Sequence, residues 1–357
     1  MKKLLITTSL IFVALLLVSF ITQESDSQTN RLRKIYSQHP SQWPAPAVDE
    51  NVKWKELGLI PPSPIENQKD SLKNIIALGK TLFFDPRLSS SGKISCATCH
   101  DPALHWTDKK EKSIGHEGAT TQRNAPSILN SWVYHKLFWD GRARDLQDQA
   151  FGPIESESEM NSEMPDVIRT LRRIKGYQEL FEKAFGKNEI NPDRMTEAIA
   201  VFENTIVSNK SRFDHFLEGN KKALSISELR GLHLFRTKAK CMNCHHGALM
   251  TDNQFHNIGT AGTDVGLYKV THADADSGKF KTPSLRDVMY TAPWLHDGSL
   301  KHIEAVIDKL NQPAMNGQVS HLIRPLHLNK NEKKDLISFL NAISAPVPHF
   351  EKPVLPQ

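Results

Sequence analysis

Four cysteines constrain this chain more than any other feature, because all four fall in one short pattern that occurs twice. The pattern is C-x-x-C-H, first at residues 96–100 and again at residues 241–245. In this pattern two thiols add to the vinyl groups of one haem, and the histidine supplies a proximal nitrogen to the iron. A zinc site or a redox-active dithiol would use the same thiols, but the two pairs lie far apart and a histidine follows each. The sequence therefore predicts two covalent c-type haems, held by Cys96, Cys99, His100, Cys241, Cys244 and His245.

The N-terminus has the layout of an export signal. Lys2 and Lys3 precede an apolar run from Leu4 to Ile21, and a polar stretch follows. A basic start, an apolar segment and a polar exit are typical of a cleaved signal peptide. The run is also long enough to span a bilayer, so a retained anchor is the alternative. In both cases we expect residues 1–22 to direct the export of the rest of the chain.

Composition favours a soluble body of two domains. The chain has 357 residues, of which 39% are hydrophobic and 24% charged, so two cores of ordinary size can form. The formal net charge is +5, but lysine and arginine are scattered rather than clustered. We therefore expect no nucleic-acid partner.

Two amphipathic segments precede the two haem motifs. The first covers Asp70–Phe84, and the second begins at Ser225, which forms a capping-box pattern with Glu228. Both contain Gly-x-x-Leu-Phe, at Gly79–Phe83 and Gly231–Phe235. This weak internal repeat indicates two related haem domains. We expect each glycine to let a second helix approach closely, although a glycine can also be an ordinary weakness in a helix.

A closing helix is predicted in each half. One begins at Asn191-Pro192, with the apolar residues Met195, Ile199, Phe202 and Ile206. The other begins near Asn329, has Glu332 at the capping-box position, and carries Leu336, Ile337, Leu340 and Ile343.

The predicted fold is mostly α, because alternating apolar patterns that would build a large sheet are missing from the sequence. It comprises two cytochrome c-like haem domains with long loops and an extended N-terminal arm, which is rich in proline and tryptophan. We place the arm at 23–66, the domains at 67–212 and 213–346, and a tail at 347–357.

Several longer stretches lie in a fixed order around the haem motifs. They include RNAP at 123–126, FWDGR at 138–142, GPI at 152–154, FKTPSLR at 280–286 and TAPWLHDG at 291–298. On these stretches the chain from Leu72 to Ile343 resembles the bacterial di-haem cytochrome c peroxidase family, which includes MauG-like enzymes. The resemblance implies a periplasmic enzyme that reduces hydrogen peroxide at the N-terminal haem. Its electrons would come from a small cytochrome c or cupredoxin through the C-terminal haem.

The resemblance also implies roles around the N-terminal haem. Glu159 matches the distal acid–base carboxylate, and Gln149 matches the glutamine of the distal pocket. Trp139 matches the tryptophan between the haems, although a large aromatic residue is also typical of a packed core. From the residue pattern alone, Glu159 is not separable from its neighbours Glu155, Glu157 and Glu163.

The distal ligand of the N-terminal haem is expected in a loop. By the resemblance, His116 takes this place, with His105 as a weaker competitor. Spacing alone favours a surface histidine, and many relatives keep an open site instead.

The second haem departs from the family pattern. The position where relatives carry a distal Met or Tyr is Leu310, which cannot bind iron. Met315, Lys309 and a five-coordinate iron are the alternatives.

The resemblance further implies a calcium site between the domains. Asn124 would supply an amide oxygen, and Thr291 and Pro293 would supply backbone carbonyls. The alternative for Asn124 is ordinary turn chemistry. A homodimer is also compatible with the resemblance.

Two other functions stay open from the sequence. A MauG-like enzyme would use peroxide to oxidise a partner protein, but such relatives favour a tyrosine where this chain has Leu310. A di-haem electron carrier or redox sensor would have no use for a distal carboxyl such as Glu159.

Overall fold

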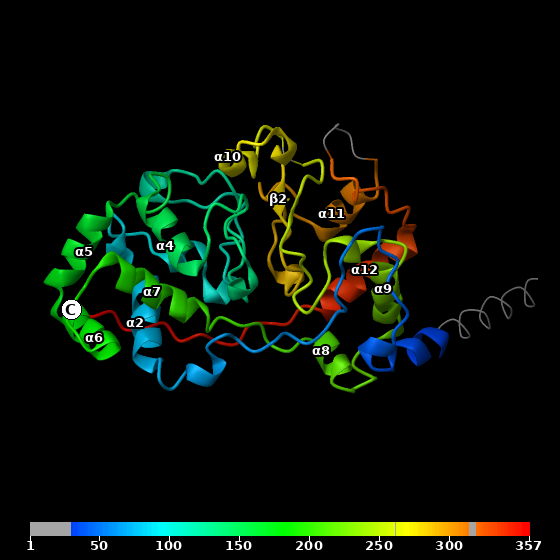
Figure 1. The fold of residues 1–357 in the computed structure, drawn as a ribbon, viewed down its shortest axis with the longest axis horizontal. Helices are drawn as coiled ribbons and strands as arrows, with labels where there is room; N and C mark the ends of the chain where they lie inside the picture. Colours follow the sequence, from blue (N-terminus) through cyan, green and yellow to red (C-terminus); the bar gives the residue numbers. More distant parts are fainter. Residues whose placement is uncertain (1–29, 261, 314–318) are drawn as a thin grey trace, which may run out of the picture.

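A computed structural model describes residues 30–260, 262–313 and 319–357. The described chain is mostly helical and forms two halves, each around its own hydrophobic cluster, as Figure 1 shows. Its strands are limited to β1 (Phe255–His256) and β2 (Phe280–Lys281), which pair antiparallel with Phe255 opposite Lys281. The predicted fold class is confirmed.

The N-terminal half is built from helices around the first C-x-x-C-H motif. A buried cluster of aromatic and aliphatic side chains, including Phe83 and Phe202, forms its core. The helices are α2 (Lys73–Phe84), α3 (Cys96–Cys99), α4 (Leu146–Glu155), α5 (Met164–Arg173), α6 (Lys175–Phe185) and α7 (Pro192–Glu203).

The C-terminal half repeats this plan with fewer helices. Phe235 and Phe339 meet edge to face in its core, with ring centroids 5.3 Å apart. The helices are α8 (Arg212–Leu217), α9 (Ile226–Arg236), α10 (Tyr268–Thr271), α11 (Ile303–Leu310) and α12 (Lys330–Ala342).

The predicted helix starts are confirmed at three of four positions. The Asn191 side chain accepts a hydrogen bond from the backbone N–H of Arg194 at 3.0 Å. Capping boxes form at Ser225 and at Asn329. Helix α2 begins at Lys73 rather than Asp70, because residues 66–72 form a 3₁₀ turn and irregular turns first.

Two predicted helix ends were also too long. Helix α7 stops at Glu203, so Ile206 packs from the following loop, and Ile343 caps α12.

The two repeated glycines are contact points between helices, as predicted. A Cβ at Gly79 would lie 1.8 Å from the carbonyl oxygen of Ala198 on α7. A Cβ at Gly231 would lie 2.0 Å from the carbonyl oxygen of Asp335 on α12. The helix before each haem motif therefore crosses its closing helix with the backbones in direct contact.

The N-terminal arm is not extended throughout, because residues 30–36 are helical. Leu32, Tyr36, Trp43 and Leu57 join the core of the C-terminal half. Residues 30–36 therefore dock as a helix, and the proline-rich chain that follows is largely extended, apart from the 3₁₀ turn Pro40–Gln42.

The C-terminal tail runs from α12 to the N-terminal half, in the same direction as the arm (Figure 1). The Phe350 ring stacks on Phe84 at 5.5 Å between centroids, and Arg87 donates to the carbonyl of Pro356 at 2.9 Å. The boundaries that we place at 212 and 346 stay predictions.

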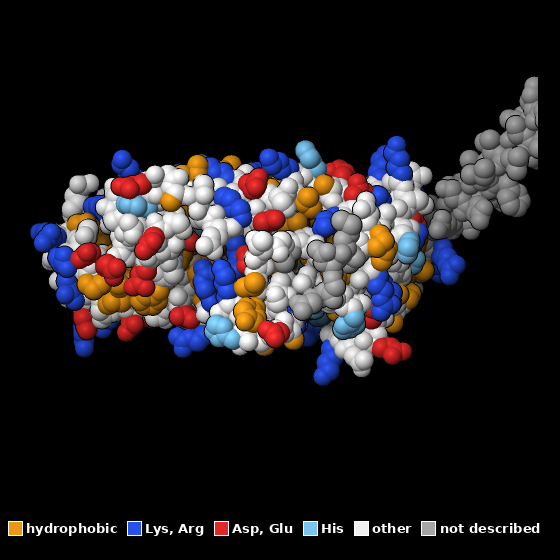
Figure 2. Space-filling model, turned by 90° about the horizontal axis from the view of Figure 1, so that it is seen from above, with side chains coloured by type: hydrophobic (Ala, Val, Ile, Leu, Met, Phe, Trp, Pro, Cys, Tyr) orange, Lys and Arg blue, Asp and Glu red, His pale blue; other side chains and the backbone are white. Residues whose placement is uncertain are grey.

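Over the described residues, no helix combines the length and apolarity that crossing a bilayer requires. The predicted signal segment, residues 1–22, lies outside the described residues. Basic and acidic side chains are interspersed over the face shown in Figure 2.

Candidate functional site

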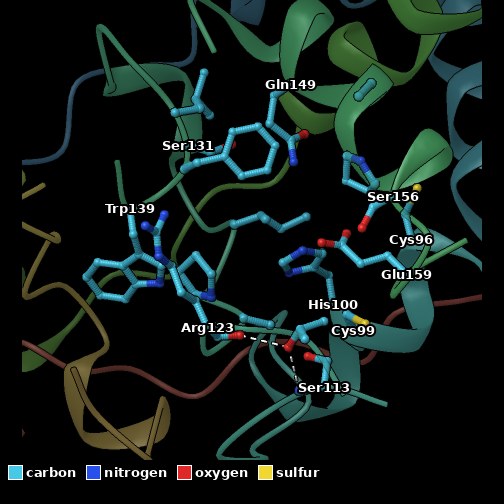
Figure 3. Close-up of a pocket in the computed structure, with 18 of the residues that line it drawn as sticks. Cys96, Cys99, His100, Ser113, Arg123, Ser131, Trp139, Gln149, Ser156 and Glu159 are labelled. Atoms are coloured by element: carbon cyan, nitrogen blue, oxygen red, sulfur yellow. Dashed lines mark hydrogen bonds between the residues drawn. The ribbon is translucent and has the colours of Figure 1, made fainter. Parts of the chain in front are cut away.

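The first C-x-x-C-H motif opens onto a cavity of about 540 Å³ between α3, α4 and α7. Helix α3 is a single turn, whose start is fixed by the Thr98 hydroxyl accepting from the backbone N–H of Ser95 at 3.0 Å. This turn points both cysteines and His100 into the cavity, as Figure 3 shows.

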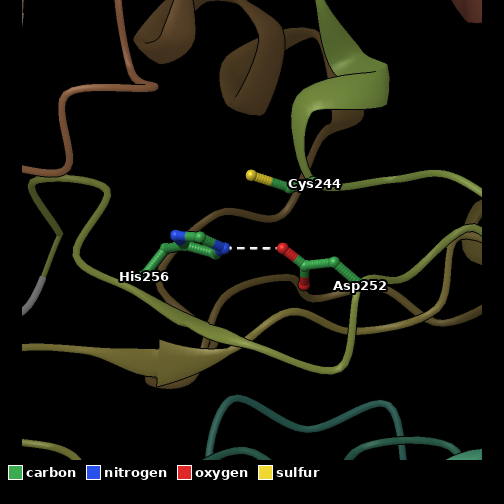
Figure 4. Close-up of side chains that lie close together, drawn as sticks. All are labelled: Cys244, Asp252 and His256. Atoms are coloured by element: carbon green, nitrogen blue, oxygen red, sulfur yellow. Dashed lines mark hydrogen bonds and ion pairs between the residues drawn. The ribbon is translucent and has the colours of Figure 1, made fainter. Parts of the chain in front are cut away.

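The second motif opens onto a cavity of about 300 Å³ in the C-terminal half. Cys241, Cys244 and His245 line it, and most of its wall is aliphatic or aromatic. Cys244 also lies near Asp252 and His256, whose side chains are hydrogen bonded at 2.7 Å (Figure 4). Because a haem thioether would occupy this sulfur, the three residues do not form an independent metal site.

Both histidines are oriented for iron ligation. His100 Nδ1 lies 3.1 Å from the Trp106 carbonyl oxygen, and His245 Nδ1 lies 2.9 Å from that of Met250. A carbonyl only accepts, so Nδ1 carries the proton and Nε2 is left for a metal. Burial lowers the pKa of both imidazoles, which favours the neutral form that binds iron.

The cysteines do not have the properties of a redox dithiol. Burial raises the pKa of the Cys99 thiol to about 11, and that of Cys241 and Cys244 to about 12. Disulfide exchange needs a stabilised thiolate, which these sites disfavour. All four thiols are free, and two of them line each cavity beside an oriented histidine. This donor set fits a covalent haem in each cavity.

Of the four clustered glutamates, Glu159 is the one that lines the first cavity. Its side chain is half-buried, and burial raises its pKa, with Arg142 opposing that shift. The neighbouring Glu155, Glu157 and Glu163 are exposed and do not line the cavity. Gln149, from α4, points into the same space in Figure 3.

A shared wall separates the two cavities. Trp139 belongs to it, and its indole Nε1 donates to the Asn124 carbonyl at 2.9 Å. The Lys281 ammonium lies 3.7 Å from the centroid of the Tyr134 ring in this wall. The residues that line both cavities are Asn124, Pro126, Ser127, Tyr134, Trp139, Lys281 and Pro283.

Comparison with known proteins agrees with this geometry. Residues 73–222 match the family model described as di-haem cytochrome c peroxidase. The chain is 37% identical to the methylamine utilization protein MauG of Methylophilus methylotrophus, over 83% of this chain and 89% of that protein. It is also 37% identical to a cytochrome c551 peroxidase of Nitrosomonas europaea, over 83% of this chain and 87% of that protein.

The chain belongs to the di-haem cytochrome c peroxidase family. Among solved structures, it superimposes on a MauG-like protein associated with microbial copper homeostasis with a TM-score of 0.70 and 30% identity. That match covers 84% of this chain and 96% of the other. Two c-type haems follow from membership in this family.

In this member of the family, the loop histidine His116 does not line the cavity. Its Nδ1 lies 3.2 Å from the Ser90 hydroxyl, and its backbone N–H donates to the Glu159 carbonyl at 2.8 Å. His105 does not line the cavity either, and its ring stacks on Tyr290 while its Nε2 lies 3.3 Å from the Ala345 carbonyl oxygen. Ligation by His116 stays a prediction.

Leu310 is the last residue of α11, and it lines the second cavity as predicted from its position. Lys309 is exposed and does not line this cavity, so it is a poor candidate ligand. Met315, the other candidate, lies outside the described residues.

The three predicted calcium ligands lie close to the haem motifs. Asn124, Thr291 and Pro293 all line the second cavity, and Asn124 also lines the first. The Asn124 amide nitrogen donates to the Lys110 carbonyl at 2.8 Å. This contact directs the amide but leaves its oxygen available to a cation.

Sequence reasoning missed Glu203, at the end of α7. It lines the first cavity, only 5% of its surface is exposed, and its Oε2 has no hydrogen-bond partner in the described part of the chain. Ile199 had been assigned to the buried stripe of this helix. Glu203 lies four residues after Ile199 and therefore on the same face of the helix, so the helical period predicts that Glu203 is buried.

Proposed function

We propose that this chain is a di-haem peroxidase that reduces hydrogen peroxide to two waters. The reaction consumes two electrons and two protons for each peroxide, and a small c-type cytochrome or copper protein supplies the electrons. Glu159 carries the proposal. It is a carboxyl of raised pKa that lines the cavity of His100, whereas an electron carrier needs no acid–base group there.

We propose that Glu159 moves the proton between the two peroxide oxygens. Burial favours its neutral form more strongly than Arg142 favours its charged form, so its pKa is raised, which suits a group that both gives and takes a proton. Gln149 offers an amide in the same cavity to orient the substrate. The haem supplies the iron position at which peroxide binds and the electrons that reduce it.

We propose that Trp139 lies on the electron path. Its place in the wall shared by the two cavities supports this role, because an electron that crosses by the shortest route meets this wall. The hydrogen bond to Asn124 holds the indole in one orientation. A packing role is fully compatible with this function.

An open distal side in the first cavity is supported by His116, which contacts the Ser90 hydroxyl and does not line the cavity. We propose that this is the reactive arrangement. If His116 binds iron in another state, its loop must move.

The experiment that tests the function is steady-state oxidation of a reduced small cytochrome c by peroxide, with the haem-loaded enzyme. For Glu159→Gln we expect a fall of about 100- to 10,000-fold in kcat, which is the range of general acid–base catalysis. Glu157→Gln is the matched control, because Glu157 is exposed two residues away. An unchanged rate in Glu159→Gln, with both haems attached, would remove Glu159 from the reaction.

A second candidate is MauG-like oxidation of a partner protein by peroxide. The MauG relatives, one of them 40% identical over 79% of this chain, support it. If the wild type consumes peroxide but oxidises no small electron donor, this function replaces the first.

We also propose that the body of the chain is exported to the periplasm and that Asn124, Thr291 and Pro293 hold Ca²⁺. All three residues line the second cavity, and Asn124 also lines the first, which supports a cation that links the halves. Elemental analysis of the purified protein measures the bound calcium directly. The homodimer stays a prediction.

A further inference from the structure

Glu203 is a buried acid that the proposed reaction does not use. Helix α7 packs against α2 and α4, and its last turn carries Ile199 and Glu203 to the wall of the first cavity. Only 5% of Glu203 is exposed, and its Oε2 is buried without a hydrogen-bond partner in the described part of the chain. An ionised carboxylate in this position would be very costly, so an uncharged form is favoured.

No basic residue compensates the carboxyl group of Glu203. The charged residues of α2 and α4 are Lys73, Lys80, Asp148 and Glu155. Lys73 and Glu155 are exposed, Lys80 lies over the Phe350 ring, and Asp148 pairs with Arg144. None of them bonds to Glu203 in the described chain.

The charged groups of the cavity wall are also engaged elsewhere. Arg123 pairs with Asp140 and Asp264, and Arg142 pairs with Asp140. The other charged residues that line the cavity are Glu159, Lys269 and Lys281, and Lys281 faces Tyr134.

Glu203 lines the same cavity as the sulfur of Cys96. The charges of Glu203 and of Glu159 both raise the pKa of that thiol, after the larger effect of burial. Two acids therefore stand near one attachment point of the haem, and only Glu159 has a basic residue, Arg142, that favours its ionised form. For Glu203, burial alone raises the pKa, to about 8.

We infer that Glu203 is a proton-exchanging acid that couples protonation of this cavity to the redox state of the haem attached at Cys96 and Cys99. When the iron gains one electron, the cavity gains one negative charge, and the Glu203 carboxylate takes up one proton from water. When the iron loses that electron, the carboxylic acid releases the proton. The electron comes from the small donor protein and leaves to the oxidising substrate, and the solvent supplies and accepts the proton, so charge and protons balance in both directions.

The inference depends on the haem but not on peroxide chemistry. Opposite charges within a few ångströms favour the ionised form of an acid. A ferric haem therefore lowers the pKa of Glu203, and reduction removes this effect. The coupling is the same whether the enzyme takes its electrons from a small donor protein or oxidises a partner protein.

A redox titration of the haem-loaded protein at several pH values tests this. If one proton is taken up per electron, the equilibrium constant for reduction of the N-terminal haem falls tenfold for each pH unit of increase. Its reduction potential then falls by about 59 mV per pH unit. We expect the wild type to approach this slope near neutral to alkaline pH, and Glu203→Gln to lose at least half of it. Glu197→Gln, on the exposed face of the same helix, should keep the wild-type slope.

Two further measurements separate the role of Glu203 from that of Glu159 and from a loss of haem binding. Glu159→Gln should keep most of the slope, because a different acid carries the coupling. If Glu203→Gln does not bind haem, proton uptake by the wild type during reduction in weak buffer decides the question. A slope that survives in Glu203→Gln, or reduction of the wild type without proton uptake, would overturn the inference.

Discussion

At the scale of single residues, backbone carbonyls and burial decide the chemistry of the haem cavities. The carbonyls of Trp106 and Met250 fix the proton on Nδ1 of the two proximal histidines, and Nε2 is left for iron. In the first cavity, Glu159 has Arg142 to oppose the effect of burial, whereas Glu203 has no such partner. Different surroundings thus affect the pKa of two acids in one cavity differently.

Glu203 should make folding stability depend on pH. Burial raises its pKa from 4.5 to about 8, so between these values the folded state binds a proton that the unfolded state releases. Stability is then full below the unfolded value and declines, by at most about 1.4 kcal/mol per pH unit, as pH rises toward 8. With the haems kept reduced, we expect the urea midpoint of the haem-loaded wild type to fall between pH 5 and 8, and that of Glu203→Gln to fall less. Parallel curves for the two proteins would contradict the buried, neutral acid.

Trp139→Phe should slow electron delivery without unloading either haem. The smaller ring keeps an aromatic packing group but removes the indole and its hydrogen bond to Asn124. We expect donor oxidation to fall about tenfold or more, equivalent to a barrier increase of about 1.4 kcal/mol. Stopped-flow reduction of the two haems measures this step, and wild-type kinetics would mean that the indole only packs.

At the scale of elements, each haem is carried by a pair of crossed helices. Helices α2 and α7 form one pair, and α9 and α12 form the other. A glycine at each crossing removes the side chain that would hold the backbones apart, at Gly79 and Gly231. The short haem-binding turn follows each first helix, so the crossing positions the motif.

Gly79→Ala should therefore destabilise the N-terminal half. The added methyl group would overlap the Ala198 carbonyl, and the helices would have to separate at a cost of about 1–3 kcal/mol. Gly58→Ala is the control, because no atom lies within 4 Å of a Cβ at that position. Chemical denaturation monitored by circular dichroism measures the difference, and equal stability of the two variants would contradict the close crossing.

At the scale of the whole molecule, the two ends of the chain hold the halves together. The arm contributes Tyr36 and Trp43 to the core of the C-terminal half, and the tail brings Phe350 to the N-terminal half. Figure 1 shows both segments crossing between the halves. The wall shared by the two cavities therefore lies between halves that are joined at several points.

Phe350→Ala should loosen this connection. The ring stacks on Phe84, and its centroid lies 4.9 Å from that of Trp106. Because the side chain is only half-buried, we expect a loss of about 1–3 kcal/mol rather than the full cost of a core phenylalanine. Val354→Ala is the matched control, since Val354 is 95% exposed. A similar effect of both substitutions on the urea midpoint would show that the tail does not contribute.

The sequence by itself determined the two c-type haems, the mostly α fold and the helix starts at Asn191, Ser225 and Asn329. These are local properties, since a motif, a capping residue or a helical period acts over a few neighbouring positions. The resemblance added Glu159, which the residue pattern had not distinguished from the exposed glutamates beside it.

Only the tertiary structure decided the features that depend on residues far apart in the chain. Burial of Glu203, the position of His116 on Ser90, and the wall that places Lys281 beside Tyr134 all arise where distant segments meet. A helical period predicts that a face is covered, but not by which residues. The cost of leaving a charge without a partner there, which sets the chemistry of Glu203, follows from the packing of the whole molecule.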